Sequence, residues 1–162
     1  MKTNRIQAPI MVRPATMADV PEIHRLISDH AELNRMLFRS QTELYEHLRD
    51  FSVGDRAGVI VGCGALELVW RDLAEIKSLA VAEDARGQGI GQQLVRRLID
   101  EARMLQLRRL FALTREQAFF EKLGFAVVPK ESLPHKVWTD CVKCPVQDNC
   151  DEVAVVLNLD QD

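Results

Sequence analysis

Residues 74–91 read AEIKSLAVAEDARGQGIG and decide how the rest of the chain is interpreted. The first eight residues are strand-like, and glycines at positions 87, 89 and 91 precede the helical run QQLVRRLI at 92–99. Glycine lets a backbone approach a ligand without interference from Cβ, and the free N–H groups of a first helical turn attract anions. The stretch therefore predicts a strand over 74–81, an anion-binding loop and a helix over 89–105.

Upstream of this stretch, two capping signals predict two helices. Residues 10–13 form a short first strand, and Thr16 with Asp19 makes a capping box for the first helix. The buried stripe of that helix consists of Val20, Ile23 and Ile27. Ser40 with Glu43 opens the second helix, which we expect to continue through Leu44 and Leu48, with residues 36–39 as the loop between the helices.

Two further strands, 51–53 and 59–69, come next, and Gly54-Asp55 predicts the turn of a hairpin between them. Residues 70–73 connect the second of these strands to the strand over 74–81.

Downstream, the pattern predicts a strand over 109–114, a short helix over 117–123 that ends at Gly124, and strands over 125–128 and 153–159. The alternation indicates an α/β (α+β) fold, a mixed central sheet of six to seven strands flanked by about four helices. With 162 residues, we expect a single domain over 1–162 with a cysteine-containing loop at about 129–152.

The composition narrows the class of protein. The chain has 21 basic and 24 acidic residues, mixed along its length, for a formal net charge of -3. This argues against a nucleic-acid surface, which needs clustered positive charge. The apolar runs are far shorter than the roughly 20 residues that cross a bilayer, and residues 1–8 lack a signal peptide's apolar segment. We expect a cytoplasmic protein with no membrane partner and with reduced cysteines.

The glycine loop also resembles a known family. A dinucleotide-binding fingerprint would need a different glycine spacing and an early strand. Instead, the spacing of Arg86, Gly89 and Gly91 between a strand and an amphipathic helix resembles the coenzyme-A-binding motif of the GNAT (GCN5-related N-acetyltransferase) superfamily. The segment FFEKLGF at 119–125 resembles that superfamily's second motif, and the likeness extends over about 11–159.

The resemblance implies where acetyl-coenzyme A binds. Backbone groups of Leu79 and Val81, on either side of Ala80, would bond the pantetheine arm, and the Arg86 side chain would add positive charge. The diphosphate would lie on the backbone amides of Gly87, Gln88, Gly89, Ile90 and Gly91. Thr114 and Phe120 complete the implied coenzyme contacts.

The resemblance also implies that Glu75 is the general base, because the corresponding glutamate serves several members in this way. The residues alone fit a second interpretation equally well, in which Glu75 is an acidic residue on the solvent side of its strand, paired with Lys77 on the same face. Many members carry a general-acid tyrosine where this chain has Phe120. Water or a nearby thiol would then assist the leaving thiolate, while a backbone N–H polarises the carbonyl.

Within the superfamily, the segments 37–40, 62–66 and 109–120 look most like the acetyltransferase domain of bacterial N-acetylglutamate synthases. The implied acceptor is a small amino acid, L-glutamate first and glutamine as an alternative, in arginine biosynthesis. Arg39 suits a carboxylate because its fork binds both oxygens, and Lys77 offers a second positive charge. Arg115 is a third candidate. We expect no amino-acid-kinase-like domain of the kind that the longer synthases carry, and a homodimer is a further expectation from the family.

Cys141, Cys144 and Cys150 lie within ten positions, shortly after His135. Together with His135 or Cys63 they would supply four zinc ligands, whereas the alternative is a loop of reduced thiols.

Two other functions remain open from the sequence. One is acetylation of another small amine or of a protein amino group. The other is a non-catalytic, coenzyme-A-binding regulatory module, for which the missing tyrosine at Phe120 is the supporting feature.

Overall fold

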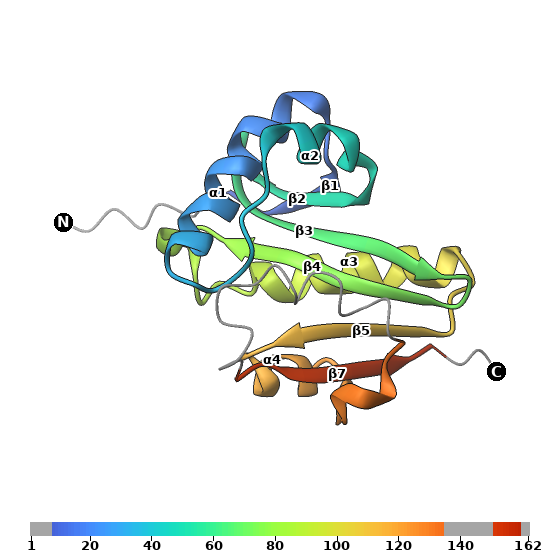
Figure 1. Ribbon diagram of the computed structural model, residues 1–162. Coiled ribbons are helices and arrows are strands. Elements are labelled where there is room, and N and C mark those ends of the chain that lie inside the picture. The colour runs from blue at the N-terminus through green and yellow to red at the C-terminus, as the bar shows by residue number, and fades with distance from the viewer. Residues whose placement is uncertain (1–7, 135–150, 160–162) are drawn as a thin grey trace. The chain divides into compact units, whose positions relative to one another are not determined.

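The computed structural model describes residues 8–134 and 151–159 (Figure 1). Its strands are β1 (Met11–Pro14), β2 (Phe51–Arg56), β3 (Val59–Trp70), β4 (Leu73–Val81), β5 (Arg109–Thr114), β6 (Ala126–Val128) and β7 (Val153–Asn158). Its α-helices are α1 (Val20–Glu32), α2 (Gln41–Glu46), α3 (Ile90–Met104) and α4 (Gln117–Glu121).

The strands follow the order β1-β2-β3-β4-β5-β7-β6. The β4–β5 pair is parallel, whereas β1–β2, β5–β7 and β6–β7 are antiparallel. This mixed sheet of seven strands, with four helices in the described part of the chain, confirms the predicted fold class.

The chain divides into two compact units. Unit 1 contains the residues up to Gly64 together with Ser78–Arg97, and unit 2 contains Ala65–Lys77 and the residues from Leu98 onward. Strands β3 and β4 and helix α3 each pass from one unit into the other. The prediction of a single domain over 1–162 stays a prediction.

Both capping signals in unit 1 are confirmed. Asp19 accepts a hydrogen bond from the Thr16 backbone N–H at 2.7 Å, and a short 3-10 turn, Met17–Asp19, leads into α1. The stripe residues Val20, Ile23 and Ile27 are fully buried. Ser40 Oγ accepts from the Glu43 N–H at 3.1 Å. Helix α2 ends earlier than predicted, at Glu46, because residues Leu48–Asp50 form a separate 3-10 turn.

The predicted position of the hairpin turn was wrong. Strand β2 continues through Gly54 and Asp55, and the turn is formed by Ala57 and Gly58, whose φ angles are 49° and 88°. Two consecutive positive φ angles are typical of a type I′ turn. The Gly58 N–H donates to Asp55 Oδ1 at 2.8 Å.

Gly54 has a packing role instead. A Cβ at Gly54 would lie 3.4 Å from Ile90 and 3.5 Å from Ile10, in ordinary van der Waals contact, so these two side chains pack against the strand at this position.

The start of α3 is anchored by apolar packing inside unit 1. Ile90 and Leu94 are buried in one cluster with Val61 and Ala85. Gly62 lets them approach closely, because a Cβ there would lie 3.0 Å from Leu94 Cδ1. The residues that begin the helix are therefore held rigidly, and so is the end of the loop before it.

Unit 2 is built around β5. Residues Leu73–Glu75 of β4 pair in parallel with Arg109–Phe111, and β7 pairs with all six residues of β5. One cluster of its core consists of Leu73, Phe111, Leu133 and Ala154. Gly124, with φ of 96°, follows α4 as predicted, since a left-handed residue ends a helix without the cost of a Cβ.

Membrane insertion through a helix finds no support in residues 8–134 and 151–159. None of the helices there combines the length and the apolar character needed to span a bilayer.

Candidate active site

The glycine loop has the backbone shape predicted for an anion site. Gly87 and Gly89 have φ angles of 78° and 79°, and α3 begins at Ile90 directly afterwards. A Cβ at either glycine would meet nothing within 4 Å. The requirement for glycine is therefore conformational, because no atom of the described residues lies within 4 Å of either Cβ position. Such a loop presents backbone N–H groups to an anion at the positive end of a 15-residue helix.

Charged and polar side chains border this loop in unit 1. The Arg86 guanidinium is half exposed and lies 3.7 Å from Glu83, which also bonds Arg35 at 2.6 Å. Arg35 lowers the pKa of Glu83 by this hydrogen bond. Arg56 bonds the side chain of Gln88. Arg86 shares Glu83 with Arg35, and its half-exposed guanidinium is accessible to an anion.

The end of β4 that leads into the loop is also in unit 1. Ala80 is buried, while Leu79 and Val81 are half-buried. His30 Nε2 lies 3.0 Å from the Val81 carbonyl oxygen, so the ring N–H donates to it. Sequence reasoning assigns no role to this histidine. His30 extends the buried stripe of α1 three residues beyond Ile27, and this spacing is the signal that could have identified it.

Ser78 interrupts β4 with a left-handed conformation, φ 53°. This conformation is costly for a residue with a Cβ. Two side chains hold it: Arg39 donates to Ser78 Oγ at 3.4 Å, and the Cys63 thiol donates to the Ser78 carbonyl at 3.5 Å. The bend thus divides β4 into a part before and a part after residue 78.

Cys63 is completely buried, and this burial raises the pKa of its thiol to about 12. Burial thus keeps the thiol protonated where it donates to the Ser78 carbonyl. The suggestion that Cys63 completes a zinc site stays a prediction. Cys141, Cys144, Cys150 and His135 lie outside the described residues. Among residues 8–134 and 151–159, no group of three or more ligating side chains could hold a metal ion.

Glu75 is buried on β4 in unit 2, with 8% of its surface exposed. It stands opposite Phe111 in the parallel pairing of β4 with β5. The alternative of an acid on the solvent side of the strand is therefore wrong. A buried carboxylate beside an aromatic ring is an arrangement suited to proton transfer.

Lys77 has a partner that the sequence did not reveal. Its Nζ lies 3.0 Å from Glu67 on β3, and the side chains are 18% and 36% exposed. The partner belongs to a different strand, so no spacing within β4 could have identified it. The positive charge expected for a substrate carboxylate is therefore matched by a carboxylate of the protein.

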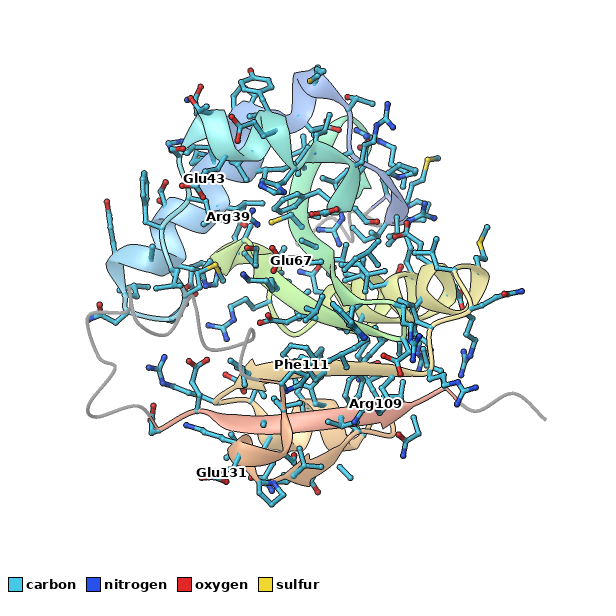
Figure 2. All side chains as sticks on the ribbon, turned by 45° about the vertical axis from the view of Figure 1, so that its right-hand side comes forward. Arg39, Glu43, Glu67, Arg109, Phe111 and Glu131 are labelled. Carbon is cyan, nitrogen blue, oxygen red and sulfur yellow. The ribbon has the colours of Figure 1, made fainter. Side chains whose placement is uncertain are left out.

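Arg39, in unit 1, is held on three sides. Its guanidinium contacts Ser78, lies 5.3 Å from the centre of the Phe51 ring, and is 3.8 Å from Glu43. Figure 2 shows Arg39 beside Glu43. The side chain is 14% exposed, whereas Glu43 is 54% exposed. A fixed guanidinium of this kind is well suited to binding a carboxylate.

The remaining predicted residues are in unit 2. Thr114 is buried, and its Oγ1 accepts from the Glu116 N–H at 2.8 Å. Phe120 is buried and makes edge contacts with Phe119 and Phe125, with ring centres 5.1 Å apart in both cases. Arg115 forms an ion pair with Asp151, which lowers the pKa of that carboxyl.

The structure thus groups most of the predicted residues by unit. Unit 1 contains the glycine loop, the end of β4 and Arg39; unit 2 contains Glu75, Lys77, Thr114 and Phe120. Strand β4 carries residues of both groups, because Glu75 and Lys77 precede the bend at Ser78 and Leu79 follows it.

Comparison with known proteins places this arrangement in context. The model of the Acetyltransferase (GNAT) family matches residues 18–125. An uncharacterized N-acetyltransferase of Chlorobaculum tepidum is 40% identical over 152 residues, which cover 94% of this chain and 98% of the relative. An amino-acid acetyltransferase of Mycobacterium tuberculosis is 42% identical over 121 residues, covering 73% of this chain and 69% of the relative.

A solved structure with the same fold is that of N-acetylglutamate synthase from Neisseria gonorrhoeae, complexed with coenzyme A and N-acetyl-glutamate. It superposes with a TM-score of 0.85 at 30% identity, covering 96% of this chain. This chain corresponds to only 36% of that protein.

Proposed function

This chain belongs to the acetyltransferase (GNAT) family, and we propose that it transfers the acetyl group of acetyl-coenzyme A to the α-amino group of a small amino acid, L-glutamate first. That it is an acyltransferase follows from the family and from its amino-acid acetyltransferase relatives. The observation that carries the proposal is β4 itself, which has the buried Glu75 before its bend and leads, after it, into the glycine loop.

We assign the coenzyme to the unit 1 end of β4. The N–H groups of residues 87–91 would bind the diphosphate, with Arg86 adding charge, and the backbone of Leu79 and Val81 would bond the pantetheine arm. His30 holds the Val81 carbonyl in place. Glu75 precedes Val81 by six positions on the same strand, and we place the thioester toward Glu75.

The chemistry follows from these positions. Glu75, through water or directly, takes a proton from the amino group, and the neutral nitrogen attacks the thioester carbonyl. A C–N bond forms, the C–S bond breaks, and the electron pair leaves with sulfur. A backbone N–H of β4 would stabilise the oxyanion of the tetrahedral intermediate. The nitrogen loses its second proton, and the thiolate takes one to become the free thiol.

Little acid catalysis is needed for the last step. A thiol has an ordinary pKa of roughly 8.5, so the thiolate is a good leaving group. Phe120 cannot donate a proton, and its burial among Phe119 and Phe125 gives it a packing role. We therefore assign protonation of the thiolate to water.

Arg39 and Lys77 are the proposed carboxylate-binding residues. Arg39 is held by Ser78 and Phe51 with its guanidinium partly exposed, and Lys77 precedes Ser78 directly on β4. A bidentate guanidinium favours a carboxylate over an amine or a hydroxyl group. This chemistry supports an acidic amino acid rather than a protein lysine as acceptor. Arginine biosynthesis, a cytoplasmic location and a homodimer belong to the same proposal.

A panel of amino acids tests the proposal. Each of the twenty is incubated with the protein and acetyl-coenzyme A, and free thiol is followed with time. We expect glutamate or glutamine to give the highest kcat/KM. If the protein binds acetyl-coenzyme A but no amino acid accelerates thiol release, the proposed acceptor class is wrong.

A further inference from the structure

Glu67 and Lys77 form an ion pair that the proposed acetyl transfer does not itself require. The two residues lie on β3 and β4, with Nζ and the carboxylate oxygen 3.0 Å apart, and Glu67 is labelled in Figure 2. Lys77 is mostly buried and Glu67 is about one-third exposed. Removing water from a pair strengthens its electrostatic interaction, so this pair is stronger than one on an open surface.

The position of Lys77 on β4 relates the ion pair to the proposed site. Lys77 lies two residues after Glu75, and side chains two positions apart share one face of a strand. The next residue, Ser78, bonds Arg39. Lys77 is thus flanked along β4 by the proposed base and by the residue that holds the proposed carboxylate-binding arginine.

The two proposed carboxylate-binding cations differ in how closely the protein neutralises them. The carboxylate of Glu43 is 3.8 Å from Arg39 and more than half exposed, so it is readily displaced. Glu67 is 0.8 Å closer to its cation and less exposed. Within unit 2, Lys77 and Glu67 together would therefore meet the acceptor's side chain.

A side-chain amide fits such a pair as well as a carboxylate does. An amide oxygen can accept from the Lys77 ammonium while the amide NH2 donates to Glu67. A carboxylate can use only Lys77 and is repelled by Glu67.

We infer that Glu67 is a specificity-determining residue that lets the acceptor site take glutamine as well as glutamate. This inference rests on the proposed function. The negative charge of Glu67 lowers the advantage of the second carboxylate and supplies an acceptor for the amide. Without that charge, the site would favour glutamate strongly.

The test is the ratio of kcat/KM for glutamate to kcat/KM for glutamine, measured in Glu67→Gln and in the unaltered protein. We expect the unaltered protein to use both substrates within about tenfold of each other. Glu67→Gln should raise the ratio on the order of tenfold, as expected for loss of a unit charge several ångströms away. A loss of stability would change both rates together and leave the ratio unaltered.

Two further variants serve as controls. Glu67→Asp keeps the charge and should keep the ratio. Glu22→Gln breaks an ion pair of similar length, 2.8 Å to Arg25 on α1, and should also leave the ratio unaltered.

The outcomes separate the two proposals. If glutamate is acetylated but Glu67→Gln does not move the ratio, or if the unaltered protein does not use glutamine, the role of Glu67 is wrong and the proposed function stands. If no amino acid is acetylated, both are wrong.

Discussion

The two ends of β4 offer different chemical groups to a ligand: backbone N–H groups at one end and charged side chains at the other. In unit 1 the strand leads into a loop whose working groups are backbone N–H groups, made available by Gly87 and Gly89 in the left-handed conformation. In unit 2 it carries Glu75 and Lys77, charged side chains in buried or half-buried positions. A backbone site depends on local conformation, whereas a side-chain site depends on partners from distant parts of the chain.

This difference explains which functions the two ends can serve. A diphosphate is the same in every reaction of a coenzyme-A-dependent enzyme, so a loop of fixed shape suffices for it. An acceptor must be distinguished from other amines, and discrimination needs side chains whose charges can be matched or mismatched. Ser78 separates the two ends through its bend, which Arg39 and Cys63 hold.

The largest effect is expected from Glu75→Gln, at the side-chain end. The amide cannot take a proton, so kcat should fall by about 10²- to 10³-fold. The KM for acetyl-coenzyme A should stay within about twofold, because Glu75 lies far along the strand from the loop. Steady-state thiol release measures both, with Glu22→Gln as the control. A kcat within threefold of the unaltered protein would contradict the assignment of Glu75 as base.

Arg39→Met should have the next largest effect. Losing a charge-assisted, bidentate contact costs about 2–3 kcal/mol, so the KM for the amino acid should rise about 30- to 150-fold. Arg39→Lys keeps the charge without the fork and should recover only part of the loss. Acceptor saturation curves at fixed acetyl-coenzyme A give these values. A change confined to the KM for acetyl-coenzyme A would indicate that Arg39 contacts the coenzyme and not the amino acid.

Gly89→Ala tests the backbone end. An alanine in the left-handed conformation costs roughly 1–2 kcal/mol, so the affinity for acetyl-coenzyme A should fall about tenfold as the loop relaxes. Gly58→Ala is a matched control, because Gly58 has φ of 88° and a Cβ added there would meet no atom within 4 Å, as at Gly89. It should lose stability without losing affinity. Equal affinity losses in both variants would show that the effect is general destabilisation.

The smallest effect concerns Cys63, beneath the bend. Burial raises the pKa of its thiol to about 12, from an ordinary value near 9. Folding therefore favours the protonated thiol: its contribution to stability is complete below pH 9 and is lost as the pH rises toward 12. The difference in unfolding free energy between the unaltered protein and Cys63→Ala should shrink by up to about 1.4 kcal/mol per pH unit in that window. Urea unfolding at several pH values measures it, and a constant difference would contradict the burial of the thiol.

The same comparison shows what sequence reasoning can reach. The glycine loop, α3, β5 and the caps at Thr16 and Ser40 were predicted because each depends on residues within a few positions of one another. The turn after β2 was misplaced because Gly54 resembles a turn residue, although it lies inside the strand and packs against Ile90. Nothing local distinguishes these two uses of glycine.

At the site, contacts between distant residues were the ones missed. His30 and Val81 are 51 positions apart, and Cys63 and Ser78 are 15 apart. The partner of Lys77, Glu67, lies on the neighbouring strand, and its carboxylate looks in the sequence like any exposed acid. Such pairs depend on which strands pair and on the geometry of the turns between them, and not on residues within a few positions of one another.

The most direct test of the central claim compares a thioester that carries the diphosphate and nucleotide with one that carries neither. Acetyl-coenzyme A and acetyl-pantetheine, which lacks the diphosphate and nucleotide, are titrated into the protein by calorimetry. If residues 87–91 bind the diphosphate, acetyl-coenzyme A should bind saturably and acetyl-pantetheine at least about 100-fold more weakly, a loss that several charge-assisted hydrogen bonds account for. Equal affinities, or no saturable binding of acetyl-coenzyme A, would contradict the account.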